Sequence, residues 1–172
     1  EQINIGGGGG GGLGGEAAVS ASVLRYEPLV MAAAIKYGVE DHVQLLLAKI
    51  MQESGGRLPD VMQSSESIGL PRNTITDPTV SIDVGVSYFS EVLKKSGGDV
   101  RLTLQSYNFG MGYIDYAKAR GGYSKQNAIE FSNMMAAKMG WKRYGDVNYV
   151  DNVLRYLKHT SPIAPVDGGN NG

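Results

Sequence analysis

The sequence contains no cysteine and only two histidines among its 172 residues. The absence of cysteine excludes disulfide frameworks, thiolate metal sites and cysteine nucleophiles. Only His42 and His159 are available as imidazole groups, and neither lies in a recognisable motif. We therefore expect neither a histidine-rich zinc site nor a Ser-His-Asp triad.

An excess of one charge sign is also missing. Lys and Arg together number 16 and Asp and Glu 17, which gives a net charge of −1. Nucleic-acid binding needs a clear surplus of positive charge, so we expect no nucleic-acid partner. No apolar run reaches the roughly 18 residues of a membrane span. The first residues also lack the basic start and apolar core of a signal peptide.

Glycine, by contrast, is abundant, with 25 residues and an unbroken run from Gly6 to Gly12. Such a run loses much conformational entropy on ordering and has almost no side chains to bury. We expect a flexible segment at 1–18, one folded catalytic domain at 19–160 and a linker at 161–172. A domain between two flexible segments is typical of a module within a larger protein.

The folded region is predicted to be mainly helical, because apolar residues recur at helical spacing and Gly, Pro, Asp and Ser mark the ends. The predicted helices cover residues 27–37, 41–54, 77–96, 99–109, 113–120, 124–139 and 148–158. Residues 57–76 show no sustained period. They predict a long loop or a small hairpin between the second and third of these helices, and loops of that length are usually functional.

Glu53 is the most informative single residue. It occupies the next position of an apolar helical stripe formed by Val43, Leu46, Leu47 and Ile50. Burial and the C-terminal end of a helix both raise the pKa of a carboxyl group, and a protonated glutamate suits a general acid. Gly55 and Gly56 follow and leave room for a ligand. The alternative is a surface ion pair with Lys49, one turn earlier.

Three short motifs then occur in order along the chain: Gln52–Gly56, Val61–Ser64 and Ser106–Gly110. They resemble the ESGG, GLMQ and AYNxG motifs of goose-type lysozymes and soluble lytic transglycosylases. The segment Met62–Ser67, followed by Gly-Leu-Pro, is similar to the lysozyme-like domain of CwlT-type bacterial cell-wall hydrolases. The resemblance covers about 23–157.

This resemblance implies a mainly α (α+β lysozyme-like) fold with a substrate groove. It also implies peptidoglycan as substrate, cleaved at the β-1,4 bond between N-acetylmuramic acid and N-acetylglucosamine, with no cofactor and no metal. Glu53 matches the general acid of the family, and Asp60 matches a second acid seven residues later. The positions expected to bind substrate are Gln63, Ser65, Glu66, Tyr107 and Asn108.

The second carboxylate leaves alternatives open. Asp60 lies in a polar, irregular stretch, so it should stay ionised and can position water or stabilise an oxocarbenium-like state. Asp60 is also a common turn former beside Pro59, and Glu66 is a rival for the second role. The serines around Glu66 can instead satisfy backbone groups of the loop.

Four functions remain possible at this point. We expect an N-acetylmuramidase, and the alternatives are a lytic transglycosylase that forms 1,6-anhydro products, an inactive glycan-binding module and a structural spacer. By resemblance, we also expect an extracellular or wall-facing location in a Gram-positive bacterium, with possible membrane anchoring in the parent protein. The same resemblance suggests conjugation or type IV secretion machinery as a partner and a C-terminal peptidase domain in a longer chain.

Overall fold

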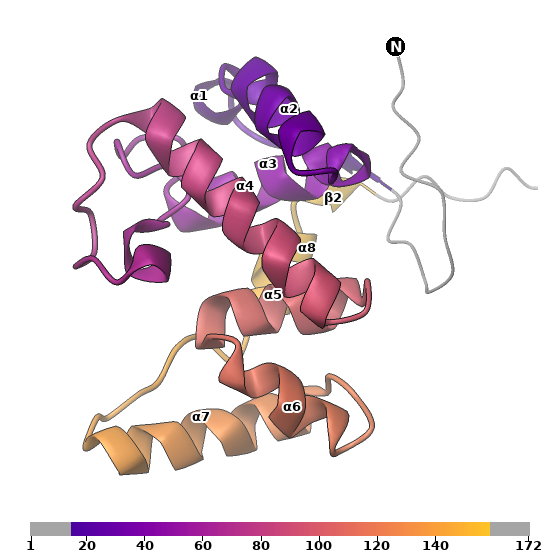
Figure 1. Ribbon diagram of the computed structural model, residues 1–172, viewed down its shortest axis with the longest axis vertical. Coiled ribbons are helices and arrows are strands. Elements are labelled where there is room, and N and C mark those ends of the chain that lie inside the picture. The colour runs from indigo at the N-terminus through magenta and orange to yellow at the C-terminus, as the bar shows by residue number, and fades with distance from the viewer. Residues whose placement is uncertain (1–14, 159–172) are drawn as a thin grey trace, which may run out of the picture.

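Helices account for most of residues 15–158, the part of the chain that the computed structural model describes (Figure 1). The α-helices are α1 (Ala21–Leu24), α2 (Glu27–Lys36), α3 (Val43–Glu53), α4 (Pro78–Lys95), α5 (Val100–Phe109), α6 (Gly112–Lys118), α7 (Lys125–Met139) and α8 (Tyr149–Leu154). The same part of the chain contains two 3₁₀ turns, η1 (Glu40–His42) and η2 (Ser65–Ile68). It also contains two short strands, β1 (Glu16–Ala17) and β2 (Leu157–Lys158). The predicted mainly helical fold class is confirmed.

Side-chain caps begin the helices where the sequence predicts them. Asp77 accepts a hydrogen bond from the Thr79 amide at 2.9 Å at the start of α4. Asp99 accepts one from the Leu102 amide at 3.0 Å at the start of α5. At the start of α7, Ser124 and Asn127 form a reciprocal capping box. These ends are predictable because a cap involves residues only two or three positions apart.

Other boundaries differ from the sequence prediction. The α-helix predicted from Asp41 begins at Val43, because the chain enters it through η1. The helix predicted to reach residue 158 ends at Leu154, since the chain then turns into β2, which pairs antiparallel with β1. The predicted flexible segment 1–18 therefore includes a paired strand. Its residues 1–14 and the linker residues 161–172 lie outside the described residues.

The loop alternative describes residues 57–76 better than the hairpin alternative. Within this stretch the structure contains the turn η2 and no strand. The loop is held against α4 by a close approach at Gly85, where a Cβ atom would lie 2.7 Å from the Met62 sulfur. Glycine at this position therefore lets the loop pack on the helix.

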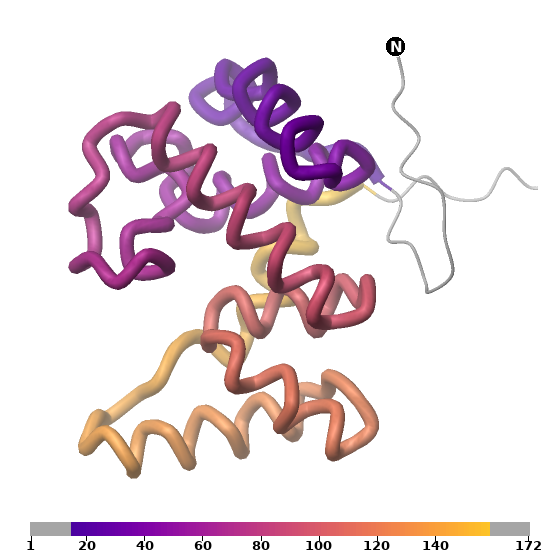
Figure 2. The backbone as a smooth tube through the Cα atoms, viewed as in Figure 1, coloured from indigo at the N-terminus to yellow at the C-terminus, as the bar shows by residue number. Residues whose placement is uncertain are grey.

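Two hydrophobic clusters form the core. The first surrounds α3, whose residues Leu46, Leu47, Ala48 and Ile50 are completely buried. The second lies among α5, α6 and α7 and includes Phe109, Tyr113 and Phe131. In Figure 2, α1–α4 form one part of the molecule and α6 and α7 another, with α5 and α8 between them. None of the helices within residues 15–158 has the length and apolarity that a bilayer crossing requires.

The missing side chain of Gly56 allows close packing of the backbone and does not make room for a ligand. Its φ angle is +72°, and a Cβ atom there would lie 2.4 Å from the Ser22 carbonyl oxygen. The missing side chain therefore makes room for the backbone of α1, which packs against the end of α3. The expectation that Gly56 leaves room for substrate is wrong.

Candidate active site

A groove of about 610 Å³ runs between the two hydrophobic clusters. It lies at the end of α3, beside the 57–76 loop, and continues along α4, the end of α5 and the segment after α7. It is lined by Glu53, Gln63, Glu66, Ser67, Arg72, Tyr88, Tyr107, Asn108, Phe109, Gly110, Trp141, Tyr144 and Gly145. The structure therefore brings together the expected residues Glu53, Gln63, Glu66, Tyr107 and Asn108. Asp60 and Ser65 do not line this groove.

Glu53 occupies the last position of α3 and is partly buried. Burial raises the pKa of its carboxyl group, and the negative charge of Asp60 adds to this effect. Lys49, a hydrogen bond from Tyr149 and Arg72 act in the opposite direction but do not cancel it. The groove therefore presents a carboxyl group that keeps its proton to a higher pH than an ordinary glutamate.

The surface ion pair with Lys49 is not formed. The Lys49 side chain is completely buried. Among residues 15–158, no ion pair within 4.0 Å joins it to Glu53. The direct partner of the Glu53 carboxyl is Tyr149, whose hydroxyl donates to Oε1 at 2.6 Å.

Asp60 is buried and does not line the groove, with only 1% of its surface exposed. Its Oδ1 accepts hydrogen bonds from the Ser64 amide at 2.9 Å and the Ser81 hydroxyl at 2.6 Å. Its Oδ2 accepts from the Ser65 hydroxyl at 2.6 Å and the Ser65 amide at 3.2 Å. Burial raises the pKa of Asp60, but these hydrogen bonds outweigh it and lower the pKa. Asp60 is thus an ionised anchor that joins the loop to α4.

Ser65 belongs to the same anchor. It is completely buried, and its hydroxyl accepts a hydrogen bond from the Ile75 amide at 3.0 Å while it donates to Asp60. Both of these contacts lie within the loop. The structure therefore does not place Ser65 where a substrate could contact it.

Gln63 reaches the groove through an unusual backbone conformation. Its φ angle is +49°, in the left-handed region that side-chain-bearing residues rarely adopt. The side-chain amide donates to the Asp60 carbonyl at 2.8 Å and to Asn73 Oδ1 at 2.7 Å, and its oxygen accepts from Arg72 Nε at 2.9 Å. Backbone strain of this kind is held by surrounding contacts and is common at functional sites.

The end of α5 supplies the facing wall. The Tyr107 hydroxyl points to the Met62 carbonyl oxygen, 3.4 Å away, and its ring lies over Lys49. Asn108 Oδ1 accepts a hydrogen bond from the Asp146 amide at 2.7 Å. The two residues therefore connect α5 both to the loop and to the segment that precedes α8.

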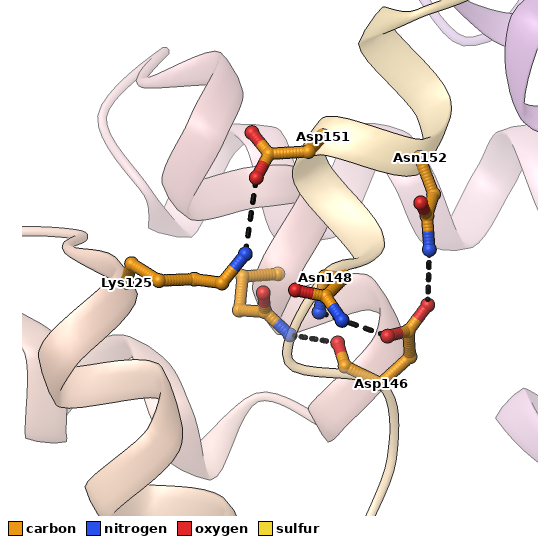
Figure 3. Close-up of polar contacts among 6 residues, drawn as sticks. Lys125, Asp146, Asn148, Asp151 and Asn152 are labelled. Atoms are coloured by element: carbon orange, nitrogen blue, oxygen red, sulfur yellow. Dashed lines mark hydrogen bonds and ion pairs between the residues drawn. The ribbon is translucent and has the colours of Figure 1, made fainter.

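Asp146 fixes the start of α8, which carries Tyr149 (Figure 3). Its carboxylate accepts hydrogen bonds from the Asn148 amide at 2.8 Å and from Asn152 Nδ2 at 3.0 Å. Its carbonyl oxygen accepts one from Gln105 of α5 at 3.0 Å. An exposed ion pair of 3.0 Å between Lys125 and Asp151 joins α8 to α7. These contacts hold Tyr149 beside Glu53.

Sequence reasoning missed an aromatic pair, Trp141 and Tyr144, that lines the groove. Trp141 is 55% exposed, and its ring stacks on Tyr144 at a centroid distance of 6.0 Å and an interplanar angle of 20°. The Tyr144 hydroxyl donates a hydrogen bond to the Phe109 carbonyl oxygen at 2.7 Å, which fixes the Tyr144 ring. One signal was available: the only tryptophan of the chain directly follows the helix stop at Gly140.

Within the described residues, no group of three or more His, Asp or Glu side chains is arranged to hold a metal ion. The groove itself presents carboxyl, hydroxyl and amide groups. One carboxyl group with a raised pKa, Glu53, and one exposed carboxyl group, Glu66, both line the groove. Such a pair suits acid-assisted cleavage of a bond with a basic leaving oxygen.

Comparisons with known proteins identify the family of the chain. The sequence pattern of the lysozyme-like family matches residues 20–170. The bifunctional muramidase/DL-endopeptidase CwlT of Bacillus subtilis (strain 168) is 54% identical over 152 residues. A pneumococcal vaccine antigen A homolog of Streptococcus pyogenes serotype M1 is 40% identical over 150 residues, which cover 86% of this chain and 71% of that protein.

A solved structure is also similar. It is a crystal structure of a protein from Staphylococcus aureus described as similar to lipoprotein, of the NLP/P60 family. The TM-score is 0.78 and the sequence identity 38%, over 84% of this chain and 55% of that chain. The match to CwlT covers 87% of this chain and 46% of CwlT, so the chain spans about half the length of these two proteins.

Proposed function

Because this chain belongs to the lysozyme-like family, we propose that it is a muramidase. Its substrate is peptidoglycan, cleaved at the β-1,4 bond between N-acetylmuramic acid and N-acetylglucosamine. The observation that carries the proposal is Glu53, a carboxyl group whose pKa is raised by burial and which lines a long groove. The muramidase activity named for CwlT, at 54% identity, supports it.

In this proposal Glu53 is the general acid. Its proton passes to the glycosidic oxygen as the bond from that oxygen to the sugar C1 breaks. Water adds its oxygen to C1 and releases one proton, so the bond is hydrolysed and the acid can be reprotonated. Removing the proton from Glu53 before substrate binds would leave the leaving oxygen without a donor, so the raised pKa supports activity near neutral pH.

The other two carboxylates take different roles. Asp60 has about four lone-pair sites, and four hydrogen bonds from Ser64, Ser65 and Ser81 already occupy them. We therefore assign Asp60 to positioning: it holds the loop that carries Gln63, and its charge helps to keep Glu53 protonated. We propose that Glu66, the other carboxyl group that lines the groove, orients the attacking water.

Product analysis tests the reaction class. When purified peptidoglycan is digested and the fragments are examined by mass spectrometry, we expect reducing N-acetylmuramic acid ends. Exclusively 1,6-anhydro ends would instead identify a lytic transglycosylase. Binding to isolated sacculi without cleavage would identify a glycan-binding module, and no binding would identify a spacer. Each of these three results would overturn the muramidase proposal.

Trp141 is expected to bind a sugar ring. Replacement of Trp141 by alanine removes its ring from the Trp141–Tyr144 stack. Large aromatic side chains supply much of the contact area in ligand-binding grooves. We expect KM for peptidoglycan fragments to rise about tenfold, which corresponds to about 1.4 kcal/mol, with kcat little changed. Because Trp141 is exposed, the free energy of unfolding should change by less than about 0.5 kcal/mol.

Met139 offers a matched control for this prediction. It is 47% exposed, lies two positions earlier and does not line the groove. Met139→Ala should leave KM unchanged. Equal KM values for Trp141→Ala and the unaltered protein would exclude a sugar-binding role for the aromatic pair.

The substrate sets the location that we propose. A muramidase meets its substrate in the cell wall, so the chain is expected to face the wall. The DL-endopeptidase activity also named for CwlT supports a peptidase domain elsewhere in a longer protein. Membrane anchoring and cooperation with conjugation or type IV secretion machinery are further parts of the proposal, and these are supported only by the resemblance to CwlT-type hydrolases.

A further inference from the structure

Lys49 is a completely buried lysine that the proposed reaction does not use. It lies on α3, one helical turn before Glu53. Most residues of this helix are buried in the first hydrophobic cluster. Burial of an ammonium group is costly unless nearby groups compensate for it. A lysine in this position therefore needs an explanation in terms of its neighbours.

Two tyrosines from other helices surround the Lys49 ammonium. Its Nζ lies 3.2 Å from the ring centroid of Tyr107 of α5, and 5.1 Å from that of Tyr149 of α8. Nζ also donates a hydrogen bond to the Tyr149 hydroxyl oxygen at 2.7 Å. The electron-rich faces of the rings attract a cation, and the hydroxyl oxygen supplies an acceptor. The surroundings thus fit a charged lysine.

The same Tyr149 hydroxyl contacts the proposed acid. It donates to Glu53 Oε1 at 2.6 Å. A phenol has one hydrogen to donate. Because the Lys49 ammonium can only donate, the Tyr149 oxygen accepts from Lys49 and its single hydrogen is directed to Glu53. Oε1 then accepts this hydrogen bond, and the carbonyl oxygen of a carboxylic acid is a stronger acceptor than its hydroxyl oxygen, so a proton carried by Glu53 lies on Oε2.

We propose that Lys49 is a positioning residue which, through Tyr149, places the acidic proton of Glu53 on Oε2 and holds a positive charge behind the carboxyl group. This inference rests on the proposed role of Glu53 as general acid. It adds a functional row of three side chains from two helices, Lys49, Tyr149 and Glu53, in which only Glu53 faces the groove.

The charged groups around this row determine its pH dependence. Burial lowers the pKa of Lys49 to about 7, against the attraction of Glu53, so the ammonium predominates below that pH. Burial raises the pKa values of Tyr107 and Tyr149 well above 10.0, and therefore both phenols stay protonated. Arg72 and Asp60 act on Glu53 from the loop, Tyr88 acts on Tyr107 from α4, and Asp146 acts on Tyr149.

Lys49→Met tests the inference because methionine has a similar length but no charge. The Lys49 charge favours ionised Glu53, so its removal raises the pKa of Glu53. A general acid loses activity when it deprotonates, and hence the alkaline limb of the pH profile should move upward by about one pH unit or more. At the optimum, kcat should fall about tenfold with KM unchanged, because the proton is no longer held on one oxygen.

The pKa of Glu53 should also be measured directly, from the ¹³C NMR titration of its carboxyl carbon in the full chain, assigned with Glu53→Gln. An upward move of this titration in Lys49→Met supports the proposal, and an unchanged titration overturns it. Lys95→Met, which removes an exposed lysine at the end of α4, should leave the titration unchanged. If Lys49→Met does not fold, Lys49→Gln provides the same comparison.

Tyr149→Phe completes the test, because it removes the hydroxyl that connects the two residues. In the double variant with Lys49→Met, the loss of kcat should be no larger than in either single variant. Fully additive losses would overturn the connection through Tyr149. Activity retained by Glu53→Gln would reject the proposed function instead, whereas the NMR titration would still report whether Lys49 acts on Glu53.

Discussion

Glu53→Gln is expected to lower the rate of peptidoglycan cleavage by at least about 100-fold, since general acid catalysis contributes that much or more. Glutamine has no proton to give to the glycosidic oxygen, but its side-chain oxygen can still accept the hydrogen bond from Tyr149. Binding to isolated sacculi should therefore persist. The measurement is the release of reducing ends at pH 6 to 7, alongside a sacculus pull-down.

The same variant is expected to be more stable than the unaltered protein above pH 4.5. The pKa of Glu53 is raised above 4.5 in the folded state, so the folded protein holds a proton that the unfolded chain releases in this range. Stability therefore decreases as the pH rises through the range, and glutamine removes this decrease. Chemical denaturation at pH 4 and pH 7 measures the effect.

Glu130→Gln is the matched control, because Glu130 is an exposed residue of α7 with a hydrogen bond to Gln126. It should leave the rate of cleavage unchanged. Cleavage by Glu53→Gln at a rate close to that of Glu130→Gln would refute the acid role. A lower stability of Glu53→Gln at pH 7 would refute the argument from the raised pKa.

Asp60→Asn is expected to reduce both activity and stability. The carboxylate accepts four hydrogen bonds from Ser64, Ser65 and Ser81, and an amide in its place offers one oxygen and two unwanted donors. Hydrogen bonds to a charged group contribute most, so we expect the free energy of unfolding to fall by about 3 kcal/mol. Activity should fall at least about tenfold, because Gln63 loses its support.

The pH dependence gives this prediction a definite sign. The pKa of Asp60 is lowered below 3.8 in the folded protein. Its stabilisation is therefore fully present above pH 3.8 and is lost as the pH falls through the lowered pKa. Asp60→Asn should remove this part of the acid sensitivity, as measured by the thermal unfolding midpoint between pH 2 and pH 5.

Two further variants separate a positioning role from a chemical one. Ser65→Ala keeps the Asp60 charge but removes one hydroxyl donor, so it should lower the free energy of unfolding by about 1 kcal/mol and also lower activity.

Glu66→Gln should lower activity and leave the free energy of unfolding unchanged, because Glu66 is exposed and lines the groove. Lost activity in Asp60→Asn with an unchanged free energy of unfolding would indicate a direct chemical role for Asp60.

The two acids differ in how far the sequence could predict them. Glu53 continues a helical stripe, and its burial follows from four neighbours on the same helix. The environment of Asp60 depends on Ser81, which is 21 positions away on α4. The sequence therefore predicted an ionised Asp60 but not that its oxygens are already occupied.

Lys49 shows why a one-sided helix pattern was misleading. The helical spacing places Lys49 at the edge of the apolar stripe, one turn before Glu53, where a surface ion pair between the two would be normal. In the structure α3 contacts α1, α2, α8 and the strands, so both faces are covered. The lysine is consequently buried, and its neighbours are aromatic rings instead of water.

The sequence by itself determined the helical class, most helix ends, the burial of Glu53 at the end of α3 and the resemblance to lysozyme-like enzymes. These features depend on helix caps and on the spacing of residues a few positions apart, which can be read directly from the sequence. Only the tertiary structure decided which side chains share the groove and which charges lie behind Glu53. Tyr149 is 96 positions from Glu53 and 100 from Lys49, and burial and pKa depend on such distant neighbours.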